Sequence, residues 1–369
     1  MSKTLISFFV LFLFTFNIGF GQNKAQRLDS LFSELYKSGK FNGNILIAEK
    51  GKTIYQNSFG IGNEKRQDKL DLNSVFELMS VSKQFTAMAI VLLKEQEKLA
   101  YDDPISQYLP SLEKYSDITL RHLMNHTSGL PDYEELLDSL FDKSKIATNE
   151  DVVQILQKNN VKRLFEPNTS YQYSQTGYAL LASIVEVVSK EKYANFMESH
   201  IFKPLGMKHT FVHTQRLNPK KIKNYALGYV QDSLKKYVLP DALSEFRGVI
   251  FHDGVIGGRG IHSTLSDLMI WDRTLKNNKL ISQKVFDEIY SPAILKNGKT
   301  SDYGFGMKIE NLPLNGLILR HTGGSYGYAT CFERHLTKDY IIIILQNHDW
   351  DYITMPTEEV RDILYWKKN

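Results

Sequence analysis

The sequence predicts an α/β protein of the α+β kind, in which one antiparallel sheet is flanked by the N- and C-terminal helices and a mostly helical lobe is inserted. Strand-like runs occur near the start of the chain and again near its end, while helical and turn-rich segments fill the middle. The composition, 42% hydrophobic and 23% charged, is that of a globular protein. The economical arrangement is therefore a single sheet built from both ends of the chain.

The first part of the chain supplies a helix, a hairpin and a buried helix. Residues 25–37 carry apolar side chains at helical spacing. Two strand-like runs, residues 43–49 and 53–60, lie on either side of the turn Lys50-Gly51-Lys52, which predicts a pair of antiparallel strands. Residues 85–93 are apolar at nearly every position, which is typical of a helix that is buried on all sides.

The later part of the chain returns from helices to strands. Helical runs alternate with irregular segments at residues 152–158, 178–190 and 265–275. Thr264 and Asp267 have the spacing of a helix cap at the start of the last run. Strand-like runs resume beyond Pro292, at residues 304–309, 317–321, 328–334 and 340–346. Residues 357–366 then predict a closing helix.

These elements predict how the chain is divided. We expect a sheet lobe from residues 22–75 and 293–369, and a helical lobe from residues 76–292. Clefts between lobes are where small-molecule sites form, so we expect the functional site at this boundary.

The N-terminus differs from the rest of the chain. Lys3 precedes an apolar run, residues 5–16, that is too short for an ordinary membrane-spanning helix, and the small residues Gly19 and Gly21 suit a cleavage site. We therefore interpret residues 1–21 as a removable secretory signal, which predicts export to the periplasm or the extracellular space. An uncleaved N-terminal anchor is the alternative. After signal removal we expect no integral membrane segment.

Charge and metal-binding residue types argue against several functions. The net charge of +4 is small for 369 residues and the lysines are scattered, so we expect no nucleic-acid partner. Cys331 is the only cysteine, which excludes an intramolecular disulfide and suggests a buried, inert thiol. His122 and His126 have the i, i+4 spacing of metal ligands, but Gly129 and its neighbours break the helix at once. We expect no metal and no cofactor.

The candidate nucleophile is Ser80, which stands where the apolar helix begins. Lys83 follows at i+3, on the same face of a helix, so its amine can meet the hydroxyl. A helix N-terminus offers unpaired N–H groups that favour an oxyanion beside Ser80. Serine needs a base, and Lys83 can be that base if burial lowers its pKa.

The spacing alone leaves an alternative open. Ser-x-x-Lys also occurs in polar sequence at Ser111/Lys114, Ser189/Lys192 and Ser233/Lys236. Only Ser80 leads into a long apolar helix, but on local sequence alone Ser80 and Lys83 can also be an ordinary helix N-terminus with a partly buried lysine.

Several further stretches, taken with Ser80, resemble the serine β-lactamase and penicillin-binding protein superfamily, from about residue 27 to residue 366. The likeness is closest to the branch of class C β-lactamases, DD-peptidases, D-aminopeptidases and related esterases. The matching stretches are Ser80-Val-Ser-Lys83, Leu123-Met-Asn-His126-Thr-Ser-Gly-Leu-Pro131, Tyr171-Gln-Tyr173-Ser-Gln175-Thr-Gly-Tyr178, Phe202-Lys-Pro-Leu-Gly-Met207, Gly257-Gly258 with Ser263-Thr264, Tyr303-Gly-Phe-Gly306 and His321-Thr322-Gly323-Gly324.

The resemblance implies a β-lactamase/transpeptidase-like fold and a set of site residues. Ser80, Lys83 and Tyr173 would be catalytic, and the backbone N–H groups of Ser80 and Gly324 would form the oxyanion hole. The remaining implied residues would bind substrate: Gln175, His321, Thr322 and Gly323. Tyr173 can otherwise be an aromatic core residue, with Tyr171 as its rival in register, and His321 and Thr322 can be ordinary strand-end residues.

Two departures from the family pattern narrow the expected function. Gln175 stands where the family has the asparagine of its Tyr-x-Asn motif, so its amide is displaced by one methylene. His321 replaces the lysine of the third motif and offers no permanent charge at neutral pH. Efficient β-lactam hydrolysis is therefore not expected.

We predict an exported serine hydrolase that acts through an acyl-enzyme on amide or ester carbonyls, as a peptidase or esterase. Its substrates would be small molecules or peptides, including those derived from peptidoglycan. The alternative is a non-catalytic envelope protein that uses the same cleft to bind peptidoglycan or peptide ligands. A competing nucleophile, Ser325, fits Gly-x-Ser-x-Gly, but that motif requires a helix after the serine and residues 328–334 are strand-like.

Overall fold

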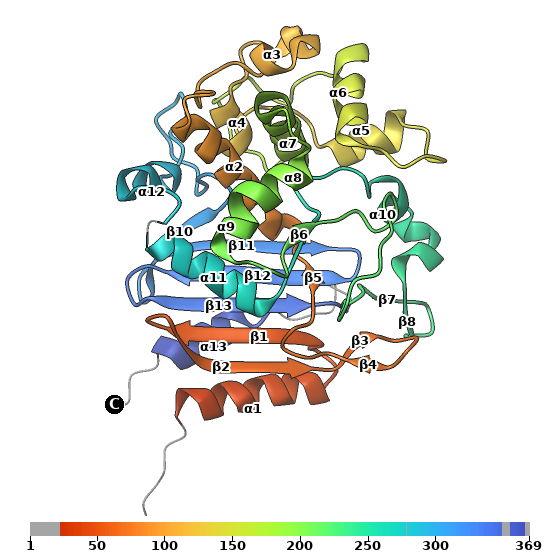
Figure 1. Cartoon of the computed structure of the whole chain (residues 1–369), viewed down its shortest axis with the longest axis vertical. Helices are drawn as coiled ribbons and strands as arrows, with labels where there is room; N and C mark the ends of the chain where they lie inside the picture. The colour runs from red at the N-terminus through yellow and green to blue at the C-terminus, as the bar shows by residue number, and fades with distance from the viewer. Residues whose placement is uncertain (1–22, 278, 349–354, 366–369) are drawn as a thin grey trace, which may run out of the picture.

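The centre of the protein is a six-stranded antiparallel sheet (Figure 1). The structure is a computed structural model that describes residues 23–277, 279–348 and 355–365. The expected signal, residues 1–21, lies outside the described residues. In spatial order the strands are β10 (Lys308–Leu312), β11 (Gly316–Ser325), β12 (Tyr328–His335), β13 (Tyr340–Gln346), β1 (Gly43–Glu49) and β2 (Lys52–Phe59). The predicted fold class, a sheet built from both ends of the chain, is confirmed.

The two halves of the sheet meet where β1 pairs with β13, from Gly43 opposite Gln346 to Glu49 opposite Tyr340. Every residue of β12 and β13 is buried, because the sheet is covered on both faces. Successive side chains of a strand point to opposite faces. Accordingly Ile342 and Ile344 belong to one hydrophobic cluster, and Ile341 and Ile343 belong to the other.

The terminal helices α1 (Lys24–Lys37) and α13 (Thr357–Tyr365) cover one face of the sheet (Figure 1). α1 begins at a capping box, in which Asn23 and Gln26 each accept a hydrogen bond from the other's backbone N–H. Leu28 and Phe32 are one helical turn apart and form the buried side of α1, which packs against the strands. The predicted helix at each end of the chain is confirmed.

The helical lobe covers the other face with α11 (Leu265–Lys276), and most of its other helices lie beyond the β11 side of the sheet (Figure 1). Its helices are α2 (Lys83–Glu95), α3 (Ile105–Tyr108), α4 (Leu120–Met124), α5 (Tyr133–Leu140), α6 (Asn149–Lys158), α7 (Gln175–Ser189), α8 (Tyr193–Met197), α9 (Lys203–Leu205), α10 (Gly248–Phe251), α11 and α12 (Gln283–Ile289). The Thr264 side chain accepts from the Asp267 N–H and caps α11, as predicted. Within the described ranges, no helix is long and apolar enough to cross a membrane.

Short strands complete the fold. A three-stranded sheet, in the order β5 (Phe76–Glu77), β9 (Ile261–Ser263), β6 (Phe211–Val212), leads the chain into α2. Two small ribbons are formed by β3 (Ile61–Asn63) with β4 (Asp68–Lys69) and by β7 (Val230–Gln231) with β8 (Tyr237–Val238). The sheet of β5 and β9 places Glu77, three residues before Ser80, beside the residues that follow Gly258.

One predicted strand is displaced. The prediction at residues 304–309 is wrong for residues 304–307, because β10 begins only at Lys308. Gly306 has a φ of +78°, and a Cβ built there would lie 2.8 Å from the Lys83 carbonyl oxygen. The chain turns here in a left-handed conformation, against the start of α2, where only glycine fits.

Candidate active site

Ser80 lies in a tight turn between β5 and α2. The turn is a 3₁₀ segment, Met79–Ser82, that continues into α2 at Lys83. The α-helix therefore begins three residues after Ser80 rather than at Ser80 itself. Met79, a buried residue, has a φ of +50°, a strained conformation for a side chain with a Cβ. The rigid helix α2, buried at nearly every position from Lys83 to Leu93, fixes this turn in place.

The Lys83 amine reaches the Ser80 hydroxyl from within the core. Nζ lies 3.1 Å from Ser80 Oγ and 3.0 Å from the Gly258 carbonyl oxygen, and it forms a third hydrogen bond with Gln175 Oε1. The side chain is fully buried. Burial lowers the pKa of Lys83 to about 7, although the carboxylates of Asp132 and Glu134 oppose that shift.

The three contacts of the amine fit both of its forms, because the ammonium can donate to all three oxygens and the neutral amine can instead accept from Ser80. A neutral amine has two N–H groups and one lone pair. The Gly258 carbonyl and the Gln175 amide oxygen only accept hydrogen bonds, so they take the two N–H groups. The lone pair then faces the Ser80 hydroxyl, which can donate its proton to Lys83.

Tyr173 lies beside this pair. It precedes α7 in an irregular segment, and Lys83 Nζ lies 4.9 Å from the centroid of its ring. Desolvation raises the pKa of Tyr173 far above its usual value, and a hydrogen bond with Ser80 opposes the shift only in part. At neutral pH the Tyr173 side chain is therefore a phenol that can give a proton, rather than a phenolate.

The C-terminal half of β11 borders the Ser80 turn. β10 pairs with β11 only as far as Arg320, so residues 321–325 are unpaired on that edge. A Cβ on Gly323 would lie 2.8 Å from Ser80 N and 2.5 Å from the Leu78 carbonyl oxygen. Only glycine therefore allows this close approach. Gly323 is buried against the turn, and the next residue, Gly324, is exposed beside it.

His321 supplies no positive charge to the site. Its Nε2 lies 2.8 Å from the Tyr303 hydroxyl and its Nδ1 lies 2.6 Å from the Thr322 carbonyl oxygen. A carbonyl only accepts, so Nδ1 carries the proton and Nε2 accepts from Tyr303. Burial and the charge of Lys83 lower the pKa of His321 to about 3. The neighbouring Thr322 is exposed.

Gln175 faces the lysine because of how α7 begins. Its backbone N–H donates to Asp132 Oδ2 at 2.8 Å, and the other oxygen of Asp132 accepts from the Glu134 N–H and caps α5. Asp132 thus fixes the starts of two helices. The longer side chain of Gln175 then reaches the Lys83 amine with its amide oxygen.

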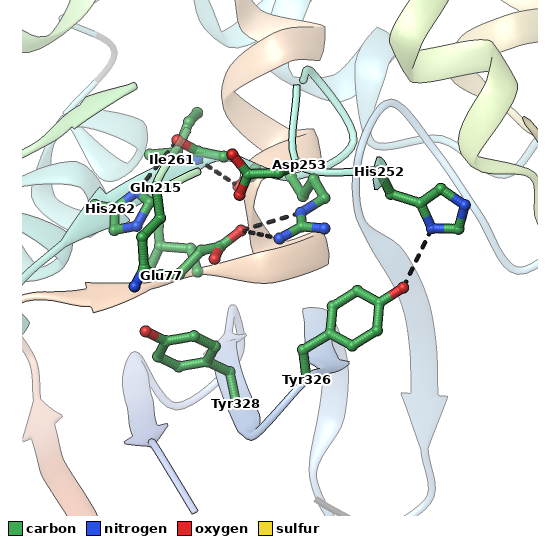
Figure 2. Close-up of polar contacts among 12 residues, drawn as sticks. Glu77, Gln215, His252, Asp253, Ile261, His262, Tyr326 and Tyr328 are labelled. Atoms are coloured by element: carbon green, nitrogen blue, oxygen red, sulfur yellow. Dashed lines mark hydrogen bonds and ion pairs between the residues drawn. The ribbon is translucent and has the colours of Figure 1, made fainter. Parts of the chain in front are cut away.

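Two contributors were missed in the sequence. Gly258 acts through its carbonyl, for which the Gly257-Gly258 pair is the only signal. Arg259, the next residue, forms a buried ion pair with Glu77, with its Nε and Nη2 each 3.1 Å from one carboxylate oxygen (Figure 2). These partners are 182 positions apart, so no local pattern predicts the pair.

The rival residues do not have the surroundings that their motifs require. Ser325 ends β11, and the turn of Tyr326 and Gly327, both with positive φ, leads directly into β12. This hairpin is not the strand–turn–helix that a nucleophile elbow requires. Lys114 donates to the Asn159 carbonyl oxygen and Lys192 pairs with Glu186, rather than with the serines of their motifs.

The remaining candidate residues, Cys331 and His122, lie in ordinary structural environments. Cys331 is buried, and burial raises the pKa of its thiol. His122 Nδ1 accepts from the Thr119 N–H in a capping box at α4. Across the described ranges no three His, Cys, Asp or Glu side chains are grouped as a metal ion would need.

A sheet with helices on both faces and a serine–lysine pair at its edge define the class, a serine hydrolase of the β-lactamase and penicillin-binding protein type. The chain belongs to the beta-lactamase family, whose model matches residues 28–351.

Three proteins are similar to this chain in sequence or in fold. Penicillin-binding protein 4* of Bacillus subtilis (strain 168) is 43% identical over 331 residues, 89% of this chain and 73% of that protein. Teichoic acid D-alanine hydrolase of Staphylococcus aureus (strain NCTC 8325 / PS 47) is 26% identical over 314 residues, 84% of this chain and 71% of that protein. The crystal structure of D-amino acid amidase from Ochrobactrum anthropi SV3 shares the fold with a TM-score of 0.73, at 23% identity over 92% of this chain and 96% of that one.

Proposed function

We propose that this chain is an exported serine hydrolase that forms an acyl-enzyme at Ser80 from amide or ester substrates. The observation that carries the proposal is the buried Lys83 amine, 3.1 Å from Ser80 Oγ, with a pKa lowered to about 7. A lysine that is half neutral near pH 7 can act as a general base for serine.

In the proposed acylation step, Lys83 takes the Ser80 proton as Oγ attacks the substrate carbonyl carbon. The carbonyl oxygen becomes an oxyanion and is held by the backbone N–H groups of Ser80 and Gly324. Tyr173 donates its phenolic proton to the departing amine or alcohol and is reprotonated from Lys83. The C–N or C–O bond breaks, and the acyl group remains on Oγ.

Deacylation in this proposal is the reverse sequence with water. The same base removes a proton from water, the oxyanion forms in the same place, and Ser80 Oγ leaves with a proton returned by Lys83 or Tyr173. Thr322 and the edge of β11 from His321 to Gly323 border the position that the substrate would occupy.

A peptidase or esterase fits these residues better than an efficient β-lactamase. β-Lactams and C-terminal peptides carry a carboxylate, and a neutral His321 offers it no countercharge. Gln175 is engaged with Lys83, so its amide is not directed at an acyl group. The similar proteins are named for penicillin binding, D-alanine hydrolysis and D-amino acid amide hydrolysis, which supports small or peptide-like substrates, including those derived from peptidoglycan.

A fluorophosphonate probe tests the nucleophile. We expect mass spectrometry to map the adduct to Ser80, with turnover of p-nitrophenyl esters and D-amino-acid amides abolished by Ser80→Ala and mostly kept by the matched control Ser325→Ala. An adduct elsewhere, or full turnover by Ser80→Ala, would contradict the proposal. Ligand binding without any turnover would favour the non-catalytic alternative. Export is tested separately, since a secreted chain that still begins at Met1 would exclude the cleaved signal.

A further inference from the structure

Tyr173 lies in a segment without regular secondary structure. Residues 171–174 belong to no helix or strand, and α7 begins only at Gln175. Tyr173 keeps 37% of its surface exposed although its phenol is desolvated, so burial alone does not fix its ring. Its phenol nevertheless has to stay next to Ser80 and Lys83 to transfer a proton, because proton transfer needs hydrogen-bond geometry. Neighbouring groups must therefore supply its position.

His126 holds the backbone on both sides of Tyr173. The N–H of Gln172 donates to the His126 carbonyl oxygen at 3.0 Å, and the N–H of Ser174 donates to His126 Nδ1 at 3.2 Å. His126 can make both contacts because it stands in the turn after α4 with a φ of +58°. The amides before and after the tyrosine are thus bound to a single residue.

The imidazole also packs on the tyrosine ring. The ring centroids of His126 and Tyr173 are 4.3 Å apart, and those of Tyr303 and Tyr178 lie 4.6 and 5.2 Å from His126. His126 is 2% exposed, and burial together with the charge of Lys83 lowers its pKa well below the usual value.

The hydrogen bond from Ser174 fixes the tautomer of this neutral ring. Nδ1 accepts, so the proton is on Nε2, which has no hydrogen-bond partner among the described residues and lies between aromatic rings. Aromatic faces attract an N–H weakly.

We propose that His126 is a positioning residue for Tyr173: a neutral imidazole that binds the Ser174 amide and packs on the phenol ring, and so keeps the phenol at Ser80. The inference rests on the proposed role of Tyr173. Among the described residues, no hydrogen bond joins His126 to Ser80 or Lys83, so its proposed effect on the reaction passes through Tyr173.

Other contacts hold the same loop without the imidazole. The N–H of Asn168 donates to the Thr127 carbonyl oxygen at 2.8 Å, and the N–H of Leu164 donates to the Gly129 carbonyl oxygen at 2.8 Å. The Thr176 hydroxyl donates to the Pro131 carbonyl oxygen at 2.7 Å. All three acceptors are backbone oxygens, so they remain when the side chain of residue 126 is changed. A variant of His126 should therefore loosen Tyr173 without unfolding the loop.

A double-mutant cycle tests the proposal, with p-nitrophenyl acetate as a substrate reactive enough to leave residual turnover. In the wild type we expect His126→Leu to lower kcat by about 100-fold with little change in KM, as for a displaced catalytic group. In the Tyr173→Phe background we expect His126→Leu to have almost no further effect, because the phenol that it positions is already absent. The control His122→Gln changes a histidine one turn earlier and should leave kcat unchanged.

Equal losses in both backgrounds would show a merely structural role and overturn the inference. Full activity of Tyr173→Phe alone would instead overturn the proposed role of Tyr173, and the inference would fall with it.

A second pair of variants applies if His126→Leu does not fold. Asparagine places its amide oxygen near the site of Nδ1 and tolerates a positive φ, whereas glutamine reaches toward the site of Nε2. We expect His126→Asn to keep kcat within about 10-fold of the wild type, and His126→Gln to lose about 100-fold. Equal activities of the two variants would overturn the inference.

Discussion

Two buried basic side chains, Lys83 and Arg259, lie close together in this protein, and their surroundings shift their pKa values in opposite directions. Lys83 is bound by the carbonyl oxygen of Gly258, and the next residue is Arg259. Arg259 is paired with the Glu77 carboxylate through two contacts of 3.1 Å (Figure 2). The hydrogen-bond partners of the Lys83 amine are a hydroxyl, an amide oxygen and a carbonyl oxygen, all uncharged.

The difference in partners decides the charge of each group. Burial lowers the pKa of Lys83 to about 7, whereas the Glu77 carboxylate raises the pKa of Arg259 against the same penalty. A buried guanidinium cannot lose its proton and needs a carboxylate, but a buried amine can become neutral. The arginine pair therefore joins β5 to the segment after Gly258, and Lys83, which has only uncharged hydrogen-bond partners, can lose its proton.

Replacing Lys83 with arginine should have the largest effect on activity, because a guanidinium stays protonated and cannot accept the Ser80 proton. We expect Lys83→Arg to lower kcat/KM by about 10³-fold or more in an ester hydrolysis assay. The matched control is Lys94→Arg in the same helix, where the lysine is paired with Glu95. Retention of a tenth of the wild-type kcat/KM by Lys83→Arg would mean that another group is the base.

Removing the carboxylate partner of Arg259 should cause the largest loss of stability. Glu77→Gln leaves a charge that is buried without its carboxylate, so we expect the free energy of unfolding to fall by about 3–5 kcal/mol in urea titration. The double variant Glu77→Gln/Arg259→Gln should recover part of this loss. The half-exposed pair of Lys94 and Glu95 is the control, and Glu95→Gln should change stability by less than about 1 kcal/mol. A loss no larger than that of the control would show that the buried pair is dispensable.

The helices and strands could be predicted because the pattern of apolar residues that specifies each one lies within a short stretch of sequence. Alternating and continuous apolar runs identified the strands and the helices, and β13 has the predicted bounds. The strand predicted at residues 304–309 failed for a tertiary reason. Its apolar residues resemble a strand, but Gly306 turns the chain against Lys83 and Gln84.

Local spacing predicted contacts of the site only where the residues are close in sequence, whereas Tyr173, Gln175 and His321 were expected from the family resemblance alone. Ser80 and Lys83 are three positions apart, and the predicted contact is present at 3.1 Å. The orientation of Gln175 toward Lys83 depends on Asp132, 43 positions from Gln175, and the charges that act on Lys83 are those of Asp132, Glu134 and Arg259. Such contacts follow from packing in three dimensions, which no spacing in the chain specifies.

The pH dependence of turnover should report the protonation of Lys83 directly. Below the pKa of Lys83, kcat/KM should fall about tenfold for each pH unit. With a pKa of about 7, the neutral base is lost as the pH falls, so kcat/KM should decline below about pH 7. His321, with a pKa of about 3, and His126, with a pKa still lowered by burial, remain neutral in this range and do not contribute. We expect Glu134→Gln to move this decline to lower pH, because the Glu134 carboxylate stabilises protonated Lys83 and raises its pKa. A decline that moves to higher pH in Glu134→Gln, or that persists unchanged in Lys83→Arg, would assign it to another group.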